Sequence, residues 1–386
     1  MLNLTTADKA LKDYYLDAIS EQLNTGVNPI FAQIEKTSEN VYGKTIKKIV
    51  TAELNGGISA GTESGDLPSA KNTDYKEFVL ELKNLYGTIE ISDKAIRASG
   101  DNQGAVVNLL NAEMEALVKA SKENLSRMMF GDGTGSLGVC FLNVYEGKNH
   151  ITMNGVLRLK PGFYYDIYDT KGDIVFSELK VVSVYNNGAY VESDVDFSTL
   201  SSNTYYISLH GSKGNEITGL KALFSESETL YGLNRSENAW LNPYKMTMSG
   251  PLSKDEFDLV IDEVESRGGE QIDFFVCSRK IRTIVKKMLI ENDAQLEPVV
   301  LENGYKTFAY NGIPFILDDN CSNDLFLINT KHLKLYQLCD WEWLESEDGK
   351  ILHQVPGKAA YSATLVKYCE LLCDKPSTMG IIENIG

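Results

Sequence analysis

Small and apolar residues recur at helical spacing over residues 102–130. They follow steps of three and four, the pattern of a helix with one buried stripe, at Val107, Leu110, Met114, Leu117, Ser121, Leu125 and Met128. Asp101 is placed to cap the first turn and Gly131 to end the helix. At about 1.5 Å per residue this helix is roughly 40 Å long, so we expect a spine that crosses a whole subunit.

A shorter helix is predicted near the N-terminus. Thr5 and Asp8 have the spacing of a capping box, and an apolar stripe follows at Leu11, Tyr14, Tyr15, Ala18 and Leu23. Gly26 and Pro29 end this helix. The next residues, NPIFAQIEKTSENVYGKT, have no clear period, which is typical of an arm that lies on another surface.

Residues 44–91 show the two-residue alternation of β-strands. KTIKKIVTAEL is rich in β-branched residues, KEFVLEL alternates at Phe78, Leu80 and Leu82, and TIEIS alternates at Ile89 and Ile91. Between these runs lies NGGISAGTESGDLPSAKNTD, which has almost no apolar residues. A loop of this length is either a flexible tip with a function or disordered.

The pattern changes over residues 137–216, where strand-like runs alternate with short turns. The runs are VLRLKPG, FYYDIYDTKGD, SELKVVSVYNNG, AYVESDVD and TYYISLHGSKG. Lys171-Gly172-Asp173 and Asn186-Asn187-Gly188 are turn signals. We therefore expect a small inserted all-β domain, for which a barrel is one solution.

Residues 217–386 read as an α+β region. Ser253 and Glu256 form a capping box before a helix that Gly268-Gly269 ends, and Ser278 caps a second helix. IDFFV is a predicted buried strand, and KTFAYNGIPFILDD is a predicted hairpin that turns at Asn311-Gly312. DLFLINTKHLKLYQL and AAYSATLVKYCELLCDKP supply further strands.

Composition and charge narrow the function classes. The 386 residues correspond to roughly two to three domains. With 37 Lys and Arg against 54 Asp and Glu, the net charge is −17, so the basic face that sequence-specific nucleic-acid binding requires is not expected. The polar, amphipathic start does not resemble a secretory signal, and no run of about 18 apolar residues predicts a membrane span.

Three glycine-containing segments partly match catalytic or nucleotide-binding motifs. Gly57-Ile58-Ser59-Ala60-Gly61 fits the nucleophile motif of a serine hydrolase, but TESGDLPSA after it cannot begin the required helix. Gly43-Lys44-Thr45 lacks the preceding glycine of a phosphate-binding loop and leads into a strand. Gly131, Gly133 and Gly135 follow a helix, whereas a dinucleotide fingerprint follows a strand. Flexible loops or turns account for all three better.

Titratable residues give no catalytic, cofactor or metal site. His150, His210, His332 and His353 have no partner at metal-ligand spacing and are read as ordinary surface or partly buried histidines. The acidic residues Asp340, Glu342, Glu345, Glu347 and Asp348 surround Trp341 and Trp343, which suggests a solvated hairpin tip rather than glycoside chemistry. Reduced, buried thiols are expected at Cys140, Cys277, Cys321, Cys339, Cys369 and Cys373.

The order of these parts resembles the Hong Kong 97 fold of tailed-bacteriophage major capsid proteins. The residues that carry the resemblance are NPIFAQIEKTSENVYGKTI, LKNLYGTIEISDKAI and LLNAEMEALVKASKENLSRMMFGDGTG, then FAYNGIPFILDD and LVKYCELLCDKPSTMG. The stretch from Asn28 to Gly135 is the most similar, and the C-terminal third matches more loosely. Residues 137–216 have no counterpart in the minimal fold.

The resemblance implies a role for each part. Residues 1–43 would be the N-terminal arm, 44–91 the extended loop, 92–136 the peripheral domain with its spine helix and 137–216 the inserted β-rich domain. Residues 217–386 would form the axial domain, with a return to the peripheral domain at the C-terminus. Some family members join subunits by a Lys–Asn isopeptide bond. Lys71 and Lys76 lie near the loop tip, but no asparagine or carboxylate here matches the motif.

The implied function is a structural, non-enzymatic subunit that assembles as hexamers and pentamers into an icosahedral shell around phage DNA. It would need no cofactor, no membrane and no sequence-specific DNA contact. A separate scaffolding protein, a portal and decoration proteins are the implied partners, and the virion capsid, assembled in the host bacterial cytoplasm, is the implied location. The alternatives are an encapsulin-like nanocompartment shell and a serine hydrolase built around Ser59.

Overall fold

The computed structural model describes most of the chain. The described residues are 30–98, 103–153, 159–185, 188–192, 197, 204–301, 304–321, 323–346 and 349–386. They divide into two compact units, one formed by residues 131–219 and the other by the chain before and after it. The predicted N-terminal helix and its stripe lie outside the described residues, as does Asp101. Within the described part, no helix is both long and apolar enough to cross a membrane.

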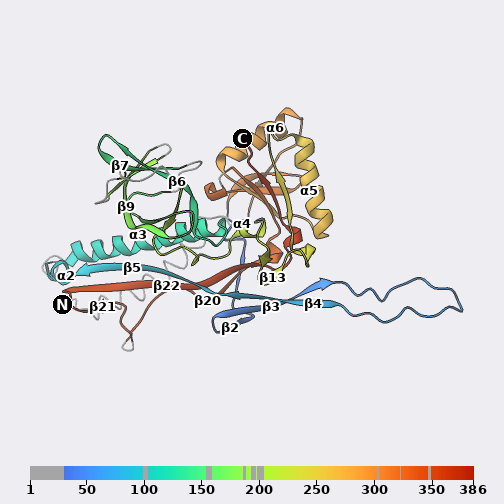
Figure 1. Cartoon of the computed structure of the whole chain (residues 1–386), viewed down its shortest axis with the longest axis horizontal. Coiled ribbons are helices and arrows are strands. Elements are labelled where there is room, and N and C mark those ends of the chain that lie inside the picture. The colour runs from blue at the N-terminus through green and yellow to red at the C-terminus, as the bar shows by residue number, and fades with distance from the viewer. Residues whose placement is uncertain are drawn as a thin grey trace. The chain divides into compact units, whose positions relative to one another are not determined.

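A long sheet and a long helix run side by side in the larger unit (Figure 1). The sheet has the order β1-β20-β22-β21, and β5 also pairs with β22. Its strands are β1 (Glu35–Thr37), β5 (Lys83–Ser92), β20 (Leu333–Trp343), β21 (His353–Gln354) and β22 (Ala360–Cys373). β5 and β22 are antiparallel over ten consecutive pairs, from Lys83 opposite Cys369 to Ser92 opposite Ala360.

Helix α3 (Gln103–Met129) is the predicted spine, preceded by the short helix α2 (Asp93–Ala98). Met114, Leu125 and Met128 of the predicted stripe are buried. Gly87 of β5 lies under the helix, where a Cβ atom would come within 2.9 Å of a Leu117 methyl group, so glycine permits the close approach of helix and sheet. The helix ends at Met129, and the first left-handed glycine after it is Gly133, not the predicted Gly131.

A second, seven-stranded mixed sheet in the same unit has the order β14-β23-β19-β15-β18-β17-β16. Its strands are β14 (Tyr244–Thr247), β15 (Phe274–Cys277), β16 (Glu297–Val300), β17 (Lys306–Tyr310), β18 (Ile313–Leu317), β19 (Leu325–Ile328) and β23 (Gly380–Glu383). Helices α5 (Lys254–Gly268) and α6 (Arg279–Glu291) contribute to its core. The rings of Phe257, Phe275 and Phe315 pack against one another at tilted angles in that core, with the centroids of the last two 4.7 Å apart.

Capping and turn chemistry explain why these elements begin and end where they do. The capping box of α5 forms between Ser253 and Glu256, and the left-handed Gly269 closes the helix. Ser278 caps α6 by accepting from the amide of Ile281. Asn311 and Gly312 both have positive φ and form the tight turn between β17 and β18, so this predicted hairpin is confirmed.

A three-stranded sheet carries a projecting loop. It consists of β2 (Val41–Tyr42), β3 (Thr45–Glu53) and β4 (Asp74–Glu81). The pairing of β3 with β4 runs from Thr45 opposite Glu81 to Glu53 opposite Asp74. Residues 54–73 connect the two strands without regular structure. We call β3 and β4 the stem, residues 54–73 the loop, and the two together the hairpin (Figure 1).

The unit of residues 131–219 contains a closed barrel with the strand order β10-β7-β6-β11-β8-β9. The strands are β6 (Ser136–Tyr145), β7 (Lys148–Met153), β8 (Tyr164–Tyr168), β9 (Ile174–Tyr185), β10 (Gly188–Glu192) and β11 (Tyr205–Leu209). Ile151, Ile167, Val181 and Ile207 fill its interior with no measurable exposure. Closure pairs these strands on both sides and leaves none of the six as an open edge.

Short elements complete the larger unit. They are α4 (Leu220–Leu223), β12 (Thr229–Leu230), β13 (Leu233–Asn234) and four 3₁₀ turns, η2 (Ala239–Leu241), η3 (Asp319–Cys321), η4 (Thr330–His332) and η5 (Pro376–Thr378). The guanidinium of the buried Arg235 donates to the backbone oxygens of Ala222 and Leu223 at the end of α4. This residue therefore satisfies carbonyl groups that the short helix leaves unpaired.

Three sequence-based assignments of elements need correction. Residues 159–162 of the expected strand VLRLKPG form a turn, while the hairpin β6–β7 was not recognised as strands. β5 does not belong to the hairpin, because it pairs with β22. Asp340, Trp341, Glu342 and Trp343 lie within β20 and not at a hairpin tip, and both tryptophans are buried. For β5 the alternation of residue types was visible, but its pairing partner β22 is distant in sequence.

Candidate functional site: the hairpin and its anchoring network

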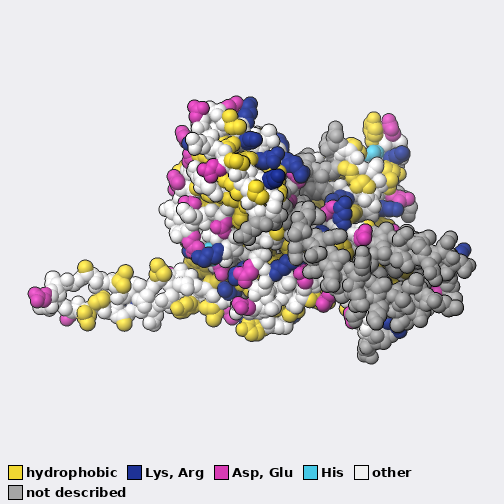
Figure 2. Space-filling model, turned by 180° about the vertical axis from the view of Figure 1, so that it is seen from behind, with side chains coloured by type: hydrophobic (Ala, Val, Ile, Leu, Met, Phe, Trp, Pro, Cys, Tyr) yellow, Lys and Arg dark blue, Asp and Glu magenta, His cyan; other side chains and the backbone are white. Residues whose placement is uncertain are grey.

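Almost all side chains of the loop are exposed to solvent. Leu54, Ile58 and Leu67 are 87%, 86% and 91% exposed, so nearly the whole of each side chain faces water. Figure 2 shows hydrophobic side chains along this extension with few charges between them. The described contacts of the loop are within the loop itself. Near its two ends, the side chain of Asn55 donates a hydrogen bond to the backbone oxygen of Lys71 at 2.6 Å. An isolated chain therefore leaves this apolar surface in water.

The stem, by contrast, has one buried face. Ile46, Val50, Phe78 and Leu80 point toward the rest of the larger unit and are buried. The Phe78 ring lies 5.1 Å from the ring of Tyr231 and 5.8 Å from that of Trp240. Ile49, Tyr75 and Val79 lie on the opposite face and are exposed. The alternation that predicted these strands thus also separates an anchored face from a free one.

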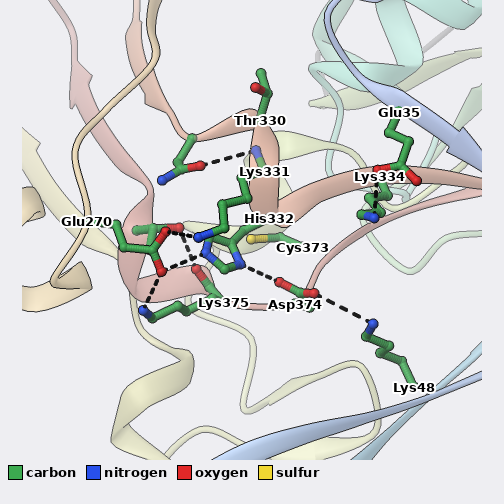
Figure 3. A network of polar contacts seen from close by, with 12 residues as sticks. Glu35, Lys48, Glu270, Thr330, Lys331, His332, Lys334, Cys373, Asp374 and Lys375 are labelled. Carbon is green, nitrogen blue, oxygen red and sulfur yellow. Dashed lines mark hydrogen bonds and ion pairs between the residues drawn. The ribbon is translucent and has the colours of Figure 1, made fainter.

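A polar network lies at the base of the stem (Figure 3). His332, at the end of η4, contacts a carboxylate with each ring nitrogen: Nδ1 is 2.7 Å from Asp374 and Nε2 is 3.0 Å from Glu270. Glu270 also binds Lys331 at 2.8 Å and Lys375 at 3.0 Å. Asp374 reaches the stem through Lys48 of β3, whose Nζ lies 3.9 Å from its carboxylate. The network therefore joins four separate segments of the chain.

Electrostatics in this network follow from its composition. Hydrogen bonds from Lys331, Lys375 and His332 lower the pKa of Glu270 to about 2. The hydrogen bond with Asp374 raises the pKa of His332, and Glu270 adds to this effect although burial opposes it. A groove of about 570 Å³ lies beside these residues, lined by Lys48–Leu54, Trp240, His332, Asp374, Lys375 and Ser377. The base of the hairpin is thus polar, charged and open on one side.

A second ionic cluster lies within the long sheet and connects β1, β20 and β22. The Lys367 side chain has no exposed surface and donates to Asp340 and Gln337, both at 2.7 Å. Asp340 also binds Lys36 of β1 at 2.9 Å. Burial alone would raise the pKa of Asp340, but Lys367, and then Lys36, lower it to about 2. The acidic segment around the tryptophans thus holds the sheet together, and its Glu347 and Asp348 lie outside the described residues.

The structure does not assemble the sequence-predicted motif residues into a catalytic site. Ser59 is exposed in the loop, and an extended strand rather than a helix follows that loop. Gly43 and Lys44 form the turn between β2 and β3, where Lys44 pairs with Glu81. Gly133 and Gly135 take left-handed turn conformations. Lys71 is exposed, and Lys76 pairs with Asp74 at 3.1 Å.

The histidines and cysteines sort by their surroundings. His210 contacts the buried Asp166 at 2.8 Å, His150 contacts the hydroxyl of Tyr185, and His353 contacts the backbone oxygen of Leu344. All six cysteines are free thiols, and burial raises the pKa of Cys140, Cys277 and Cys369 to about 12. Among the described residues, no group of three or more His, Cys, Asp or Glu could hold a metal ion.

Sequence reasoning did not find the network around His332. Its members Lys48, Glu270, His332 and Asp374 are separated by 42 to 222 residues in consecutive steps, so no local spacing marks them. One weak signal was present, since Lys331-His332 and Asp374-Lys375 place opposite charges at the start of β20 and the end of β22, which pair with each other. The contact became visible only once that pairing was known.

No protein-family model matches the sequence, and no curated protein matches it. The fold, however, is similar to that of a chain in the capsid asymmetric unit of cyanophage A-1(L), with a TM-score of 0.56 and 12% identity over 93% of each chain. Weaker likenesses are a Mycobacterium phage Bobi chain (TM-score 0.48, 9% identity, 94% of this chain and 92% of that chain) and an encapsulin from Synechococcus elongatus (TM-score 0.45, 10% identity, 95% of each). The chain therefore shares its fold with the cyanophage capsid chain, which confirms the capsid-type fold that the sequence resemblance implied.

Proposed function

We propose that this chain is the major capsid subunit of a tailed bacteriophage, a structural protein rather than an enzyme. The observation that carries this proposal is the fold likeness to a cyanophage capsid chain, which extends over 93% of both chains. A likeness confined to one domain would fit many functions, but this one extends over nearly the whole of both chains. The subunit would form a closed icosahedral shell around phage DNA and reside in the virion capsid.

The exposed hairpin supports self-assembly. Leu54, Ile58 and Leu67 leave apolar surface in water that the described residues of the subunit do not cover. In a shell built from hexamers and pentamers, a neighbouring copy would cover these side chains, and each loop would in turn lie on the next subunit. Burial of such side chains contributes about 1.5–3 kcal/mol each, so three per subunit, repeated around a closed shell, favour assembly strongly.

The net negative charge of the chain is consistent with a shell that encloses DNA without binding it tightly. A net charge of −17 repels phosphate groups, so packaged DNA would stay mobile inside the shell. A separate scaffolding protein, a portal and decoration proteins would be the other partners, with assembly in the host bacterial cytoplasm. For the division of labour, we propose residues 1–43 as arm, 44–91 as extended loop together with strand β5, which follows the hairpin and pairs with β22, 92–136 as peripheral domain, 137–216 as insertion and 217–386 as axial domain.

Electron microscopy of the purified chain, co-expressed with a scaffolding protein encoded beside it, tests the proposal. Closed icosahedral shells are expected, and particles that contain nucleic acid support a phage capsid, whereas protein cargo would favour a nanocompartment. Replacing Leu54, Ile58 and Leu67 together with serine should abolish shells. Soluble monomers from the unchanged chain, with scaffold present, would refute the proposal.

Ser59→Ala is the matched control for the loop variant. Ser59 is exposed in the same loop, but its side chain carries little apolar surface, so shells should form as in the unchanged chain. The same variant tests the alternative of a serine hydrolase. If the chain had esterase activity that depended on this serine, Ser59→Ala would abolish it and the structural assignment would fail.

A further inference from the structure

The ring of His332 lies between two carboxylates that a neutral imidazole cannot satisfy together. A neutral ring has one N–H donor and one lone pair, whereas both nitrogens here lie within 3.0 Å of a carboxylate oxygen. The geometry therefore corresponds to the doubly protonated ring. After loss of a proton, one nitrogen would present a lone pair to a carboxylate, and one of the two contacts would have to open.

The two carboxylates differ in their other partners. Glu270 also pairs with Lys331 and Lys375, both within 3.0 Å, and would keep these two cations if its contact with His332 opened. Asp374 has the His332 contact at 2.7 Å and Lys48 at the longer distance of 3.9 Å. The remaining proton of a neutral ring would therefore stay on Nδ1, toward Asp374, and the contact to Glu270 would open. Asp374 would then face a neutral ring on one side and the Lys48 ammonium on the other.

We infer that His332 and Lys48 compete for Asp374, so that protonation of His332 weakens the tether between the stem and the long sheet and deprotonation strengthens it. Two cations that share one carboxylate repel each other, and removing one charge lets the other approach. The Lys48 side chain is about one-quarter exposed and borders the groove beside the network, so it has room to move by the ångström that separates 3.9 Å from a direct ion pair.

The other charged groups around the ring do not reverse this effect. Asp273 contacts Thr330 on the far side of η4, and Lys331 and Lys375 remain with Glu270. Tyr336 and Cys373 are buried, which raises the pKa of each hydroxyl or thiol far enough to keep it neutral near pH 7. Because Asp374 raises the pKa of His332, the change falls at a higher pH than for an ordinary histidine.

Hydrogen exchange of the stem measures the tether directly. The full-length chain, kept unassembled as checked by light scattering, is compared between pH 6 and pH 8.5 after correction for the intrinsic exchange rate. Amides of β3 and β4 should exchange about two- to fivefold more slowly at the higher pH, the range expected for one partly exposed ion pair. His332→Gln and Lys48→Met should each remove this step, and His353→Gln, at a histidine outside the network, should keep it.

A stem whose protection does not change with pH, or changes in the opposite direction, would overturn the inference. A pH-dependent step that persists in Lys48→Met would also overturn it. This variant leaves the His332 ring and both carboxylates in place, so it tests the same contact if His332→Gln fails to fold. The consequence for a shell, a hairpin whose mobility follows pH, rests on the proposed function. The experiment itself needs no shells, so its failure and the failure of shell assembly are separate results.

Discussion

The barrel of residues 136–209 and the hairpin of residues 45–81 are both built from short antiparallel strands, but they bury side chains in opposite ways. The barrel closes, so its strands are paired on both sides and Ile151, Val181 and Ile207 lie fully inside. The hairpin stem buries one face against its own unit, and the loop beyond Glu53 buries almost nothing. Closure leaves none of the six barrel strands with an open edge, whereas the loop of the hairpin leaves Leu54, Ile58 and Leu67 exposed.

The comparison implies that core substitutions should affect stability and loop substitutions should affect assembly. The stem should show both effects, because one of its faces is buried against the larger unit and the other is exposed. Native-state hydrogen exchange is the suitable measurement for the stability effects, because it reports the barrel, the stem and the sheets separately, whereas a single unfolding midpoint would mix two units.

The largest stability effect is expected at the anchored face of the stem. Phe78→Ala removes a fully buried ring that packs on Tyr231 and Trp240, so opening of the stem should become about 3–5 kcal/mol easier. Val79→Ala is the matched control on the opposite, exposed face, with an expected change of about 0.5 kcal/mol or less. Equal effects of the two variants would mean that the stem is not anchored through this face.

A slightly smaller effect is expected inside the barrel. Ile207→Ala leaves a cavity in a closed core and should destabilise the barrel strands by about 2–4 kcal/mol. Exchange of the stem should not change, because the two regions belong to different compact units. Tyr206→Ser, one residue away on the outer face, is the control and should have little effect. Loss of stem protection in Ile207→Ala would show that the two units do not open independently.

The polar network at the base of the stem should contribute less to stability than the two cores do, and its contribution should depend on pH. Glu270→Gln removes the centre of three charge contacts and should destabilise the adjoining segments by about 1–2 kcal/mol at pH 7, since solvent screens part of the attraction. Because folding lowers the pKa of Glu270 to about 2, its contribution is fully present above about 4.5 and is lost as the pH falls toward 2. The difference between the variant and the unchanged chain should vanish over that range in native-state hydrogen exchange of the adjoining segments. If the stability difference stayed constant over this pH range, it would come from packing and not from the charge of Glu270.

The smallest stability effect is expected in the loop. Serine at positions 54, 58 and 67 removes apolar surface that the isolated chain already exposes to water, so the free energy of unfolding should change by about 0.5 kcal/mol or less. The same triple variant should nevertheless prevent shell formation. If the variant unfolded instead, the loop would have a role in the fold of the single subunit, and the contrast with the barrel would no longer hold.

Much of the architecture could be predicted because it rests on local rules. The spacing of Met114, Leu125 and Met128 marked the spine helix, Ser253 and Ser278 marked helix starts, and Asn311-Gly312 marked a hairpin. The long polar stretch after Glu53 marked the loop. Each of these signals lies within a few residues of the element that it specifies, so one sequence is sufficient to read it.

The remainder was decided by pairings between distant segments. Nothing near Lys83–Ser92 indicates that this strand joins β22, almost 300 residues later, and not the hairpin beside it in sequence. His332 could be read only as an ordinary histidine, because Glu270, Asp374 and Lys48 reach it from three other segments. The sequence by itself determined which residues are helical, extended or exposed, since period and capping are local. Only the tertiary structure decided which strands share a sheet and which charges meet, because those contacts depend on how the whole chain closes its core.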